Sequence, residues 1–163
     1  MKILGIDPGL ANTGWSVVEY ESGKFTVLEY GVVKTEVKEK IAVRIKKIVD
    51  TLLEKARSYS VEACGAEDIF FVKNISSGIS TAKVIGAFMY ALVSIGVDVV
   101  LFTPTEIKNA VVGVGSADKE QIRRMVMLTT RMSDKIKSDH AADSVAAAIT
   151  YASTSYMRNV TGK

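Results

Sequence analysis

The feature that most constrains the fold is the order in which strand-like and helix-like segments follow one another. Three apolar, strand-like segments come first, and two helix–strand units follow. Strands are expected at residues 2–7, 14–20, 24–33, 61–68 and 97–102, and helices at 36–58 and 76–95. A turn at Glu21-Ser22-Gly23 joins the second and third strands into a hairpin. An antiparallel meander followed by alternating helices and strands predicts an α/β domain with a mixed five-stranded sheet and helices on both faces.

Three further helices complete the expected chain. Pro104 opens a short helix, because the first helical position does not need an N–H. Asp118 is the expected N-cap of the next helix, which ends near Met132, and Gln121 stands at the reciprocal position of a capping box. The last helix is expected from Ser138 to Tyr156, and its alanine-rich sequence would let it lie close to the sheet.

Size and composition predict a single domain. The chain has 163 residues, of which 48% are apolar and 24% charged, and these are ordinary globular values. We expect a domain over residues 1–157 and a short tail over 158–163. Cys64 is the only cysteine, which excludes an intramolecular disulfide and, with no visible signal peptide, predicts a cytoplasmic location. No uncharged run exceeds fourteen residues, the length of residues 84–97, and a membrane span needs roughly 20, so no membrane association is expected.

The charge is distributed unevenly. The net charge is +3, but residues 34–57 hold eight basic against four acidic residues, and residues 104–137 hold seven against four. These segments contribute +4 and +3, so the remainder sums to −4. Basic helices beside an acidic remainder fit a protein that meets a polyanion around an acidic metal site. Ordinary solvated helix faces would give the same pattern.

Acidic residues end two of the expected strands. Asp7 ends the first strand and Glu67 closes the fourth, and strand ends of open α/β sheets face the ligand-binding crevice. If the two strands are neighbours, their carboxylates repel one another unless a cation lies between them. His140 and Asp143, three residues apart at the start of the last helix, share a face. Carboxylates suit Mg²⁺ or Mn²⁺. A turn-forming Asp7 and a structural or solvated His140 remain alternatives.

Four sequence blocks, in order over nearly the whole chain, resemble a known family. They are Gly5-Ile6-Asp7-Pro8-Gly9, Glu67-Asp68-Ile69-Phe70-Phe71, Val111-Val112-Gly113-Val114-Gly115-Ser116 and His140-Ala141-Ala142-Asp143-Ser144. Each block alone is a weak signal, but the four together are specific. The chain is similar to the RuvC family of Holliday-junction resolvases in the ribonuclease H-like superfamily. The resemblance implies a ribonuclease H-like fold.

The resemblance also implies an activity. The family resolves four-way DNA junctions by paired, symmetric, metal-dependent hydrolysis that leaves 5′-phosphate and 3′-hydroxyl ends, in homologous recombination and DNA repair. It acts as a homodimer beside a branch-migration motor of the RuvA and RuvB type. By this resemblance the catalytic and metal-binding residues are Asp7, Glu67, His140 and Asp143, which would hold two Mg²⁺ ions, with Mn²⁺ able to substitute. The expected DNA contacts are Phe70, Lys108, Lys119, Arg123 and Arg124.

The chain departs from the family pattern at a few positions. Lys83-Val84-Ile85 stands where Gln-Ala-Arg is usual, Tyr151 where His is frequent, and Asp68 where Gln is usual. None of these changes removes a matched carboxylate. Two other functions stay open: a non-catalytic junction-binding module, and a related nuclease that cuts RNA. An actin-like or sugar-kinase ATPase would need a second comparable domain, for which the chain has no room.

Overall fold

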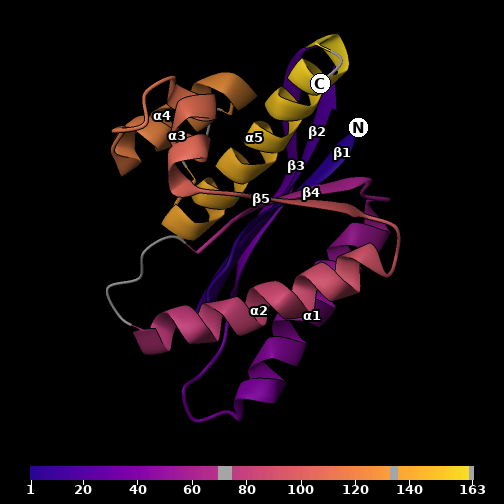
Figure 1. The fold of residues 1–163 in the computed structure, drawn as a ribbon, viewed down its shortest axis with the longest axis vertical. Coiled ribbons are helices and arrows are strands. Elements are labelled where there is room, and N and C mark those ends of the chain that lie inside the picture. The colour runs from indigo at the N-terminus through magenta and orange to yellow at the C-terminus, as the bar shows by residue number, and fades with distance from the viewer. Residues whose placement is uncertain (70–74, 133–135, 162–163) are drawn as a thin grey trace.

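A computed structural model describes residues 1–69, 75–132 and 136–161, with only the backbone described for 156–161. One five-stranded sheet runs through the molecule in the order β3-β2-β1-β4-β5 (Figure 1). Its strands are β1 (Lys2–Asp7), β2 (Asn12–Glu21), β3 (Lys24–Lys34), β4 (Ala63–Glu67) and β5 (Asp98–Phe102). β1, β2 and β3 form an antiparallel meander, whereas β4 pairs in parallel with both β1 and β5. The predicted mixed sheet is confirmed.

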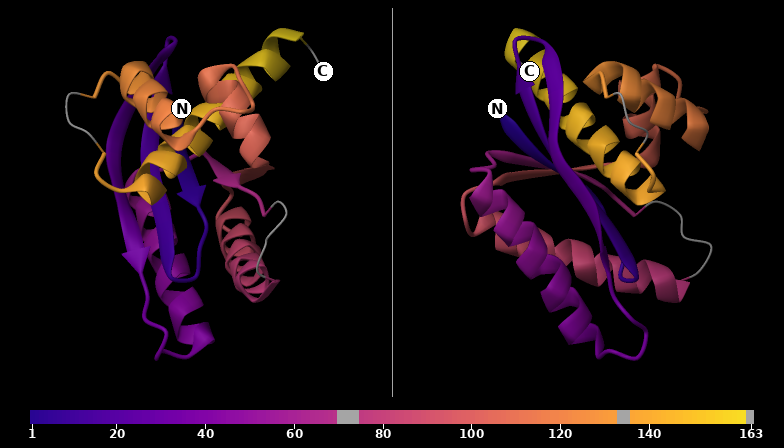
Figure 2. Two further views of the ribbon diagram at one scale, coloured as in Figure 1. Left: turned by 90° about the vertical axis from the view of Figure 1, so that its left-hand side faces the viewer. Right: turned by 180° about the vertical axis from the view of Figure 1, so that it is seen from behind.

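Helices cover both faces of the sheet, as predicted (Figure 2). The helices α1 (Ile41–Ser58) and α2 (Ile75–Val93) lie on one face. The other face carries α3 (Pro104–Val112), α4 (Lys119–Thr130) and α5 (Asp139–Thr161). α5 continues to Thr161, beyond the expected end at Tyr156, so residues 158–161 of the expected tail extend this helix.

Local signals decide where several helices begin. Two of the three helices on the face with α5 begin with capping boxes: Thr103 with Glu106 opens α3, and Asp118 with Gln121 opens α4. The helix expected from residue 36 begins later, at Ile41. Its first residues form a turn instead, because the Glu39 carboxylate accepts a hydrogen bond of 2.8 Å from the backbone N–H of Glu36.

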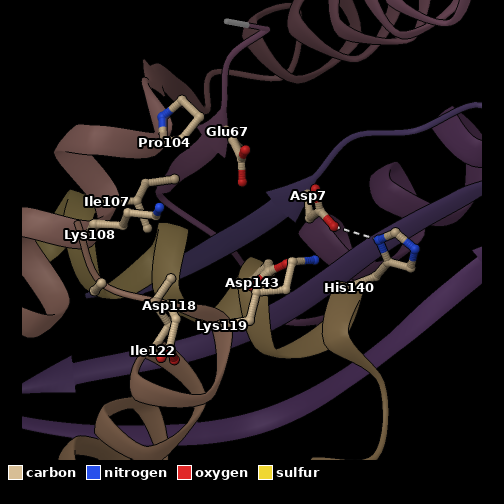
Figure 3. A pocket seen from close by; sticks show the side chains of 11 residues that line it. Asp7, Glu67, Pro104, Ile107, Lys108, Asp118, Lys119, Ile122, His140 and Asp143 are labelled. Carbon is tan, nitrogen blue, oxygen red and sulfur yellow. Dashed lines mark hydrogen bonds and ion pairs between the residues drawn. The ribbon is translucent and has the colours of Figure 1, made fainter. Parts of the chain in front are cut away.

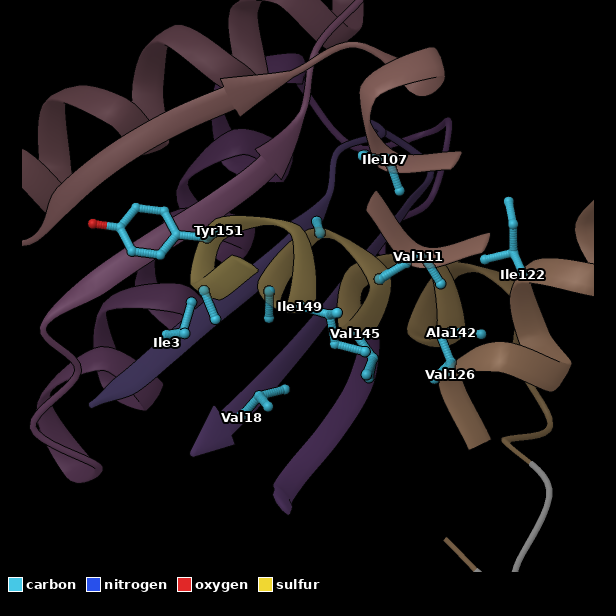
Figure 4. Close-up of a cluster of buried hydrophobic side chains, with 14 of the residues drawn as sticks. Ile3, Val18, Ile107, Val111, Ile122, Val126, Ala142, Val145, Ile149 and Tyr151 are labelled. Atoms are coloured by element: carbon cyan, nitrogen blue, oxygen red, sulfur yellow. The ribbon is translucent and has the colours of Figure 1, made fainter. Parts of the chain in front are cut away.

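Two apolar cores lie on the two faces of the sheet. In β1, Ile3 belongs to the core beneath α3, α4 and α5, while Leu4 and Ile6 belong to the core beneath α1 and α2. This alternation follows from the two-residue period of a strand. Figure 4 shows the first core, in which Val145 and Ile149 of α5 pack beside the sheet. A sheet buried on both faces is a rigid base for groups at its edge.

α5 lies unusually close to the sheet, and two glycines make this possible. A Cβ atom added to Gly5 of β1 would lie 1.9 Å from the carbonyl oxygen of Ser144, and one added to Gly14 of β2 would lie 1.9 Å from that of His140. Real Cβ atoms do not approach so closely, so any larger residue would push the helix away. The first turns of α5 therefore lie directly above the ends of the central strands.

α2 has one buried and one exposed apolar face. Val84, Ile85, Phe88 and Leu92 are buried, whereas Ile79, Tyr90 and Val93 are exposed. In the part of the chain that the structure describes, it is the one helix long and apolar enough by composition to cross a membrane, with a mean hydropathy of 1.2 over its most apolar window. The buried face accounts for part of this apolar character, because it packs into the core beneath the sheet.

Candidate active site

The neighbouring strands β1 and β4 bring two carboxylates to the same edge of the sheet. Ile6 pairs with Ala66 in parallel register, so both strands end together, with Asp7 and Glu67 as their last residues. A pocket of about 550 Å³ opens at this edge (Figure 3). Its charged and titratable lining residues are Asp7, Glu67, Lys108, Asp118, Lys119, His140 and Asp143. The structure thus brings all four sequence-predicted catalytic residues to one pocket.

The start of α5 supplies the remaining two of these residues. His140 Nδ1 lies 2.7 Å from Asp7 Oδ2, which joins the helix to the end of β1 (Figure 3). Asp143 lies one helical turn further on. The side chains of Asp7 and Asp143 are 16% and 22% exposed, whereas that of His140 is 45% exposed. The carboxylates are therefore largely withdrawn from water, and the imidazole is accessible to a substrate.

Burial and mutual repulsion make the carboxylates hard to ionise. Burial, followed by repulsion from Asp7 and Asp143, raises the pKa of Glu67 to about 7. Burial and then the charge of Asp7 raise the pKa of Asp143 to about 6. Burial also raises the pKa of Asp7, against the opposing hydrogen bond from His140. Lys119 Nζ is 3.8 Å from Asp143 Oδ2, but its side chain is 71% exposed, so it offsets little of this repulsion.

The donor set fits Mg²⁺ better than a softer metal. Among the described residues, no three His, Cys, Asp or Glu side chains are arranged as a complete metal site. Mg²⁺ does not need one, because it commonly binds one or two carboxylates and completes its octahedron with water and substrate phosphate. Asp7, Glu67 and Asp143 offer carboxylate oxygens in one pocket. Their pKa values are raised mainly by burial, so a cation bound among them would stabilise their ionised forms. The residues present therefore fit a hard divalent cation.

The predicted DNA-binding residues have different surroundings. Lys108 and Lys119 line the pocket, and Arg124 is exposed on α4. Arg123 is largely buried: its side chain is 17% exposed and forms ion pairs with Glu120 and with Asp139 at the start of α5. This residue joins α4 to α5 and is already committed to carboxylates. Phe70 lies outside the described residues.

The departures from the family pattern have structural explanations. Val84 and Ile85 are buried in the core beneath α1 and α2, so a cation has no place at position 85, and Lys83 is exposed. The Tyr151 hydroxyl donates a hydrogen bond of 2.6 Å to Asp98 Oδ2, which ties α5 to β5. Asp68 Oδ1 accepts a hydrogen bond from the backbone N–H of Ile69 and so shapes the chain after β4.

Sequence reasoning missed two features of the site. It did not identify Asp139 as the partner of Arg123, which is sixteen residues away in the chain. It also did not single out Arg44 of α1, which is buried and lines a second pocket that shares His140 with the first. A basic residue among the apolar positions of the helix was the available signal for Arg44.

Comparison with known proteins gives consistent results over most of the chain. A family model described as crossover junction endodeoxyribonuclease RuvC matches residues 3–151. The protein of that name from Clostridioides difficile is 35% identical over 167 aligned positions, covering 100% of this chain and 99% of the relative. The corresponding Treponema pallidum protein is 36% identical over 149 residues, covering 91% of this chain and 76% of the relative.

Solved structures agree with the sequence comparison. The structure of Thermus thermophilus RuvC superimposes with a TM-score of 0.90 at 31% identity, and 96% of each chain is covered. The same Thermus protein in complex with a Holliday junction substrate superimposes with a TM-score of 0.88 at 29% identity and the same coverage. The predicted ribonuclease H-like fold is confirmed. With a family model that spans most of the chain and a pocket that unites the expected acids, this chain belongs to the RuvC family of crossover junction endodeoxyribonucleases.

Proposed function

We propose that this protein resolves four-way DNA junctions by metal-dependent hydrolysis of one phosphodiester bond in each of two strands. The observation that carries the proposal is the convergence of Asp7, Glu67 and Asp143 on one pocket beside an accessible imidazole. A binding module without catalysis would gain nothing from three carboxylates that are costly to ionise. The Thermus relative has been solved with a Holliday junction substrate, which supports the same substrate here.

Mg²⁺ is the proposed cofactor, with two ions in each active site and Mn²⁺ as a substitute. Asp7, Glu67 and Asp143 would hold the ions through their carboxylate oxygens. When bound, the ions stabilise the negative charge that develops on the phosphate and on the leaving oxygen. The basic side chains Lys108 and Lys119 hold the DNA backbone over the pocket through their charge.

His140 is proposed to handle the proton of the attacking water. Its Nδ1–H donates to the Asp7 carboxylate, which fixes the ring and leaves Nε2 as the proton acceptor. The water oxygen forms a bond to phosphorus while the bond from phosphorus to the 3′ oxygen breaks. The imidazole takes up the water proton, and solvent protonates the 3′ oxygen. The products are a 5′-phosphate and a 3′-hydroxyl, which a ligase can rejoin.

A homodimer supplies the second active site that paired cleavage requires. The exposed apolar face of α2, which includes Ile79, Tyr90 and Val93, is the proposed interface. A two-fold axis through such a face places two identical sites on the two symmetric strands of a junction. The proposed setting is the cytoplasm, with a branch-migration motor of the RuvA and RuvB type as partner, in recombination and repair.

Cleavage of a synthetic four-way junction in Mg²⁺ tests the proposal. Asp7→Asn, Glu67→Gln and Asp143→Asn should each abolish cleavage and leave junction binding largely intact. Glu62→Gln, at the opposite end of β4, is the matched control and should cut normally. A structured RNA of the same shape, tested in parallel, separates a DNA resolvase from an RNA nuclease. Binding without cleavage by the unmodified protein would instead indicate a junction-binding module.

A further inference from the structure

A second pocket, of about 340 Å³, adjoins the active site at His140. The His140 side chain lines both pockets, so they are direct neighbours. The walls of the second pocket come from the loop after β1, from α1 and from α2. Besides His140, its polar lining consists of Asn12, Arg44, Ser77, Ser80 and Thr81. We call it the Arg44 pocket.

Arg44 is a buried cation without an acidic partner. The residue is 8% exposed, and within the described part of the chain no carboxylate forms an ion pair with it. Its Nε donates a hydrogen bond of 2.8 Å to Thr35 Oγ1, and this hydroxyl in turn donates one of 2.5 Å to the carbonyl oxygen of Leu10. Burying a charge without an opposite charge is costly. This relay holds the guanidinium in one orientation, with its remaining donors unused by any acid.

The composition of the pocket favours an anion. No acidic residue lines it, whereas three catalytic carboxylates line the neighbouring active-site pocket. The hydroxyls of Ser80 and Thr81 now donate to the carbonyl oxygens of Ser76 and Ser77, at 3.0 and 3.1 Å. Hydroxyl groups rotate easily, so they can turn to donate to a bound oxyanion. A guanidinium with nearby hydroxyl donors is the chemistry that recognises a phosphate.

We propose that the Arg44 pocket binds one backbone phosphate of the cleaved strand, next to the phosphate that is hydrolysed. The inference rests on the proposed function, since it assumes that the DNA strand crosses the active site. Lys108 lies across the active-site pocket from His140 (Figure 3), so the strand has a cation on either side of the carboxylates. Arg44 is thus a binding and positioning residue: it anchors the strand without touching the reacting atoms.

A test combines a charge-removing variant with a charge-removing change in the DNA. Binding of a synthetic junction is measured in EDTA, where the carboxylates hold no metal, for the parent and for Arg44→Gln. Arg57→Gln removes the same charge from an exposed position on the same helix and is the matched control. In each complex, single phosphates around the cut are replaced one at a time by neutral methylphosphonate. The salt dependence of binding is measured for the unmodified junction.

The expected result is that Arg44→Gln removes the effect of one methylphosphonate on binding. In the parent and in Arg57→Gln, methylphosphonate at one position adjacent to the cut should weaken binding roughly tenfold or more, as for loss of a charged hydrogen bond. In Arg44→Gln, methylphosphonate at that position should not weaken binding further. At the other positions it should weaken binding as it does in the parent. Its slope of log affinity against log salt should fall by about 0.9, the value for one phosphate contact. A merely structural role for Arg44 would leave that slope and the position-specific losses unchanged.

Several outcomes would overturn the inference. If the loss of binding from Arg44→Gln and the loss from methylphosphonate add at every position, no phosphate contacts Arg44. If circular dichroism shows Arg44→Gln to be unfolded, Arg44→Lys, which keeps the charge, takes its place and should retain only part of the position-specific loss. If neither variant folds, a parent scan with no sensitive phosphate beside the cut refutes the pocket. A parent that neither binds nor cuts the junction refutes the proposed function itself, which is a distinguishable result.

Discussion

The carboxylate cluster predicts that removing one negative charge stabilises the metal-free protein. In the folded chain the pKa of Glu67 is about 7, against an ordinary value of 4.5. The folded state therefore binds more protons than the unfolded state between these two pH values, so stability falls as pH rises through this window and stays low above it. At about 1.4 kcal/mol per pH unit, the cost approaches about 3 kcal/mol at pH 8 and is under about 1 kcal/mol at pH 5.

Glu67→Gln keeps the shape of the side chain and removes its charge. The variant should therefore melt higher than the parent in EDTA at pH 8, by about 4–8 °C if about 2 kcal/mol survives local relaxation. At pH 5, where Glu67 is mostly protonated in the folded parent, the gain should shrink to about 2 °C or less. Mg²⁺ should stabilise the parent at pH 8 more than the variant, because the bound ion offsets the repulsion between the ionised carboxylates of the parent.

Thermal unfolding followed by circular dichroism measures all three effects. Glu62→Gln serves as the control, since Glu62 is exposed at the other end of β4 and should show little dependence on pH or Mg²⁺. If Glu67→Gln melts lower than the parent in EDTA at pH 8, the reasoning about buried repulsion is wrong. A gain of the same size at pH 5 and pH 8 would equally contradict it, because the cause would then not be ionisation.

Three other predictions concern the helix positions, the imidazole and the dimer. Gly14→Ala should push α5 from the sheet, lower the free energy of unfolding in urea by about 1–3 kcal/mol and abolish most cleavage. Gly86→Ala, whose added Cβ contacts nothing, should not destabilise the fold. Equal effects of the two substitutions would contradict the close-packing argument. In single-turnover cleavage across pH 5–9, His140→Ala should lose most activity, while His140→Asp should keep substantial activity, because a carboxylate can also accept the proton of the attacking water. An alanine variant that cuts like the parent at every pH would make His140 a bystander. Tyr90→Glu should sediment as a monomer. Val43→Glu, the control, also replaces an exposed apolar residue by Glu, but on α1, and should sediment as a dimer. A dimeric Tyr90→Glu protein would refute the α2 interface.

The element order and several boundaries could be predicted from the sequence because their causes are local. The capping boxes at Thr103 and Asp118 depend on hydrogen bonds within three residues. The alternation of β1 side chains between the two faces of the sheet follows from the two-residue period of a strand. The placement of Asp7 and Glu67 at strand ends follows from the same local pattern. The later start of α1 was missed, because residues 36–40 carry no strong breaker and the turn depends on one side-chain contact of Glu39.

The four motif blocks determined, by resemblance, which residues to expect in the site, but not how they interact. Asp7 and His140 are 133 positions apart, and their hydrogen bond exists only because α5 rests on Gly5 and Gly14. The raised pKa values of Glu67 and Asp143 likewise depend on burial and on neighbours from other elements. Likewise, the basic residue Arg123 reads as a phosphate contact in the sequence and is committed to Asp139 in the structure.

The sequence alone therefore predicted the kind of fold, the candidate catalytic residues and a divalent cation. Only the tertiary structure decided how the predicted cations are placed: Lys108 and Lys119 line the active-site pocket, while Arg123 forms ion pairs with Glu120 and Asp139. It also decided that Arg44 is buried in a pocket lined by His140 and that no carboxylate of the described residues pairs with it. The physical reason is that periodicity and capping act over a few residues, whereas desolvation and charge pairing depend on how distant elements pack.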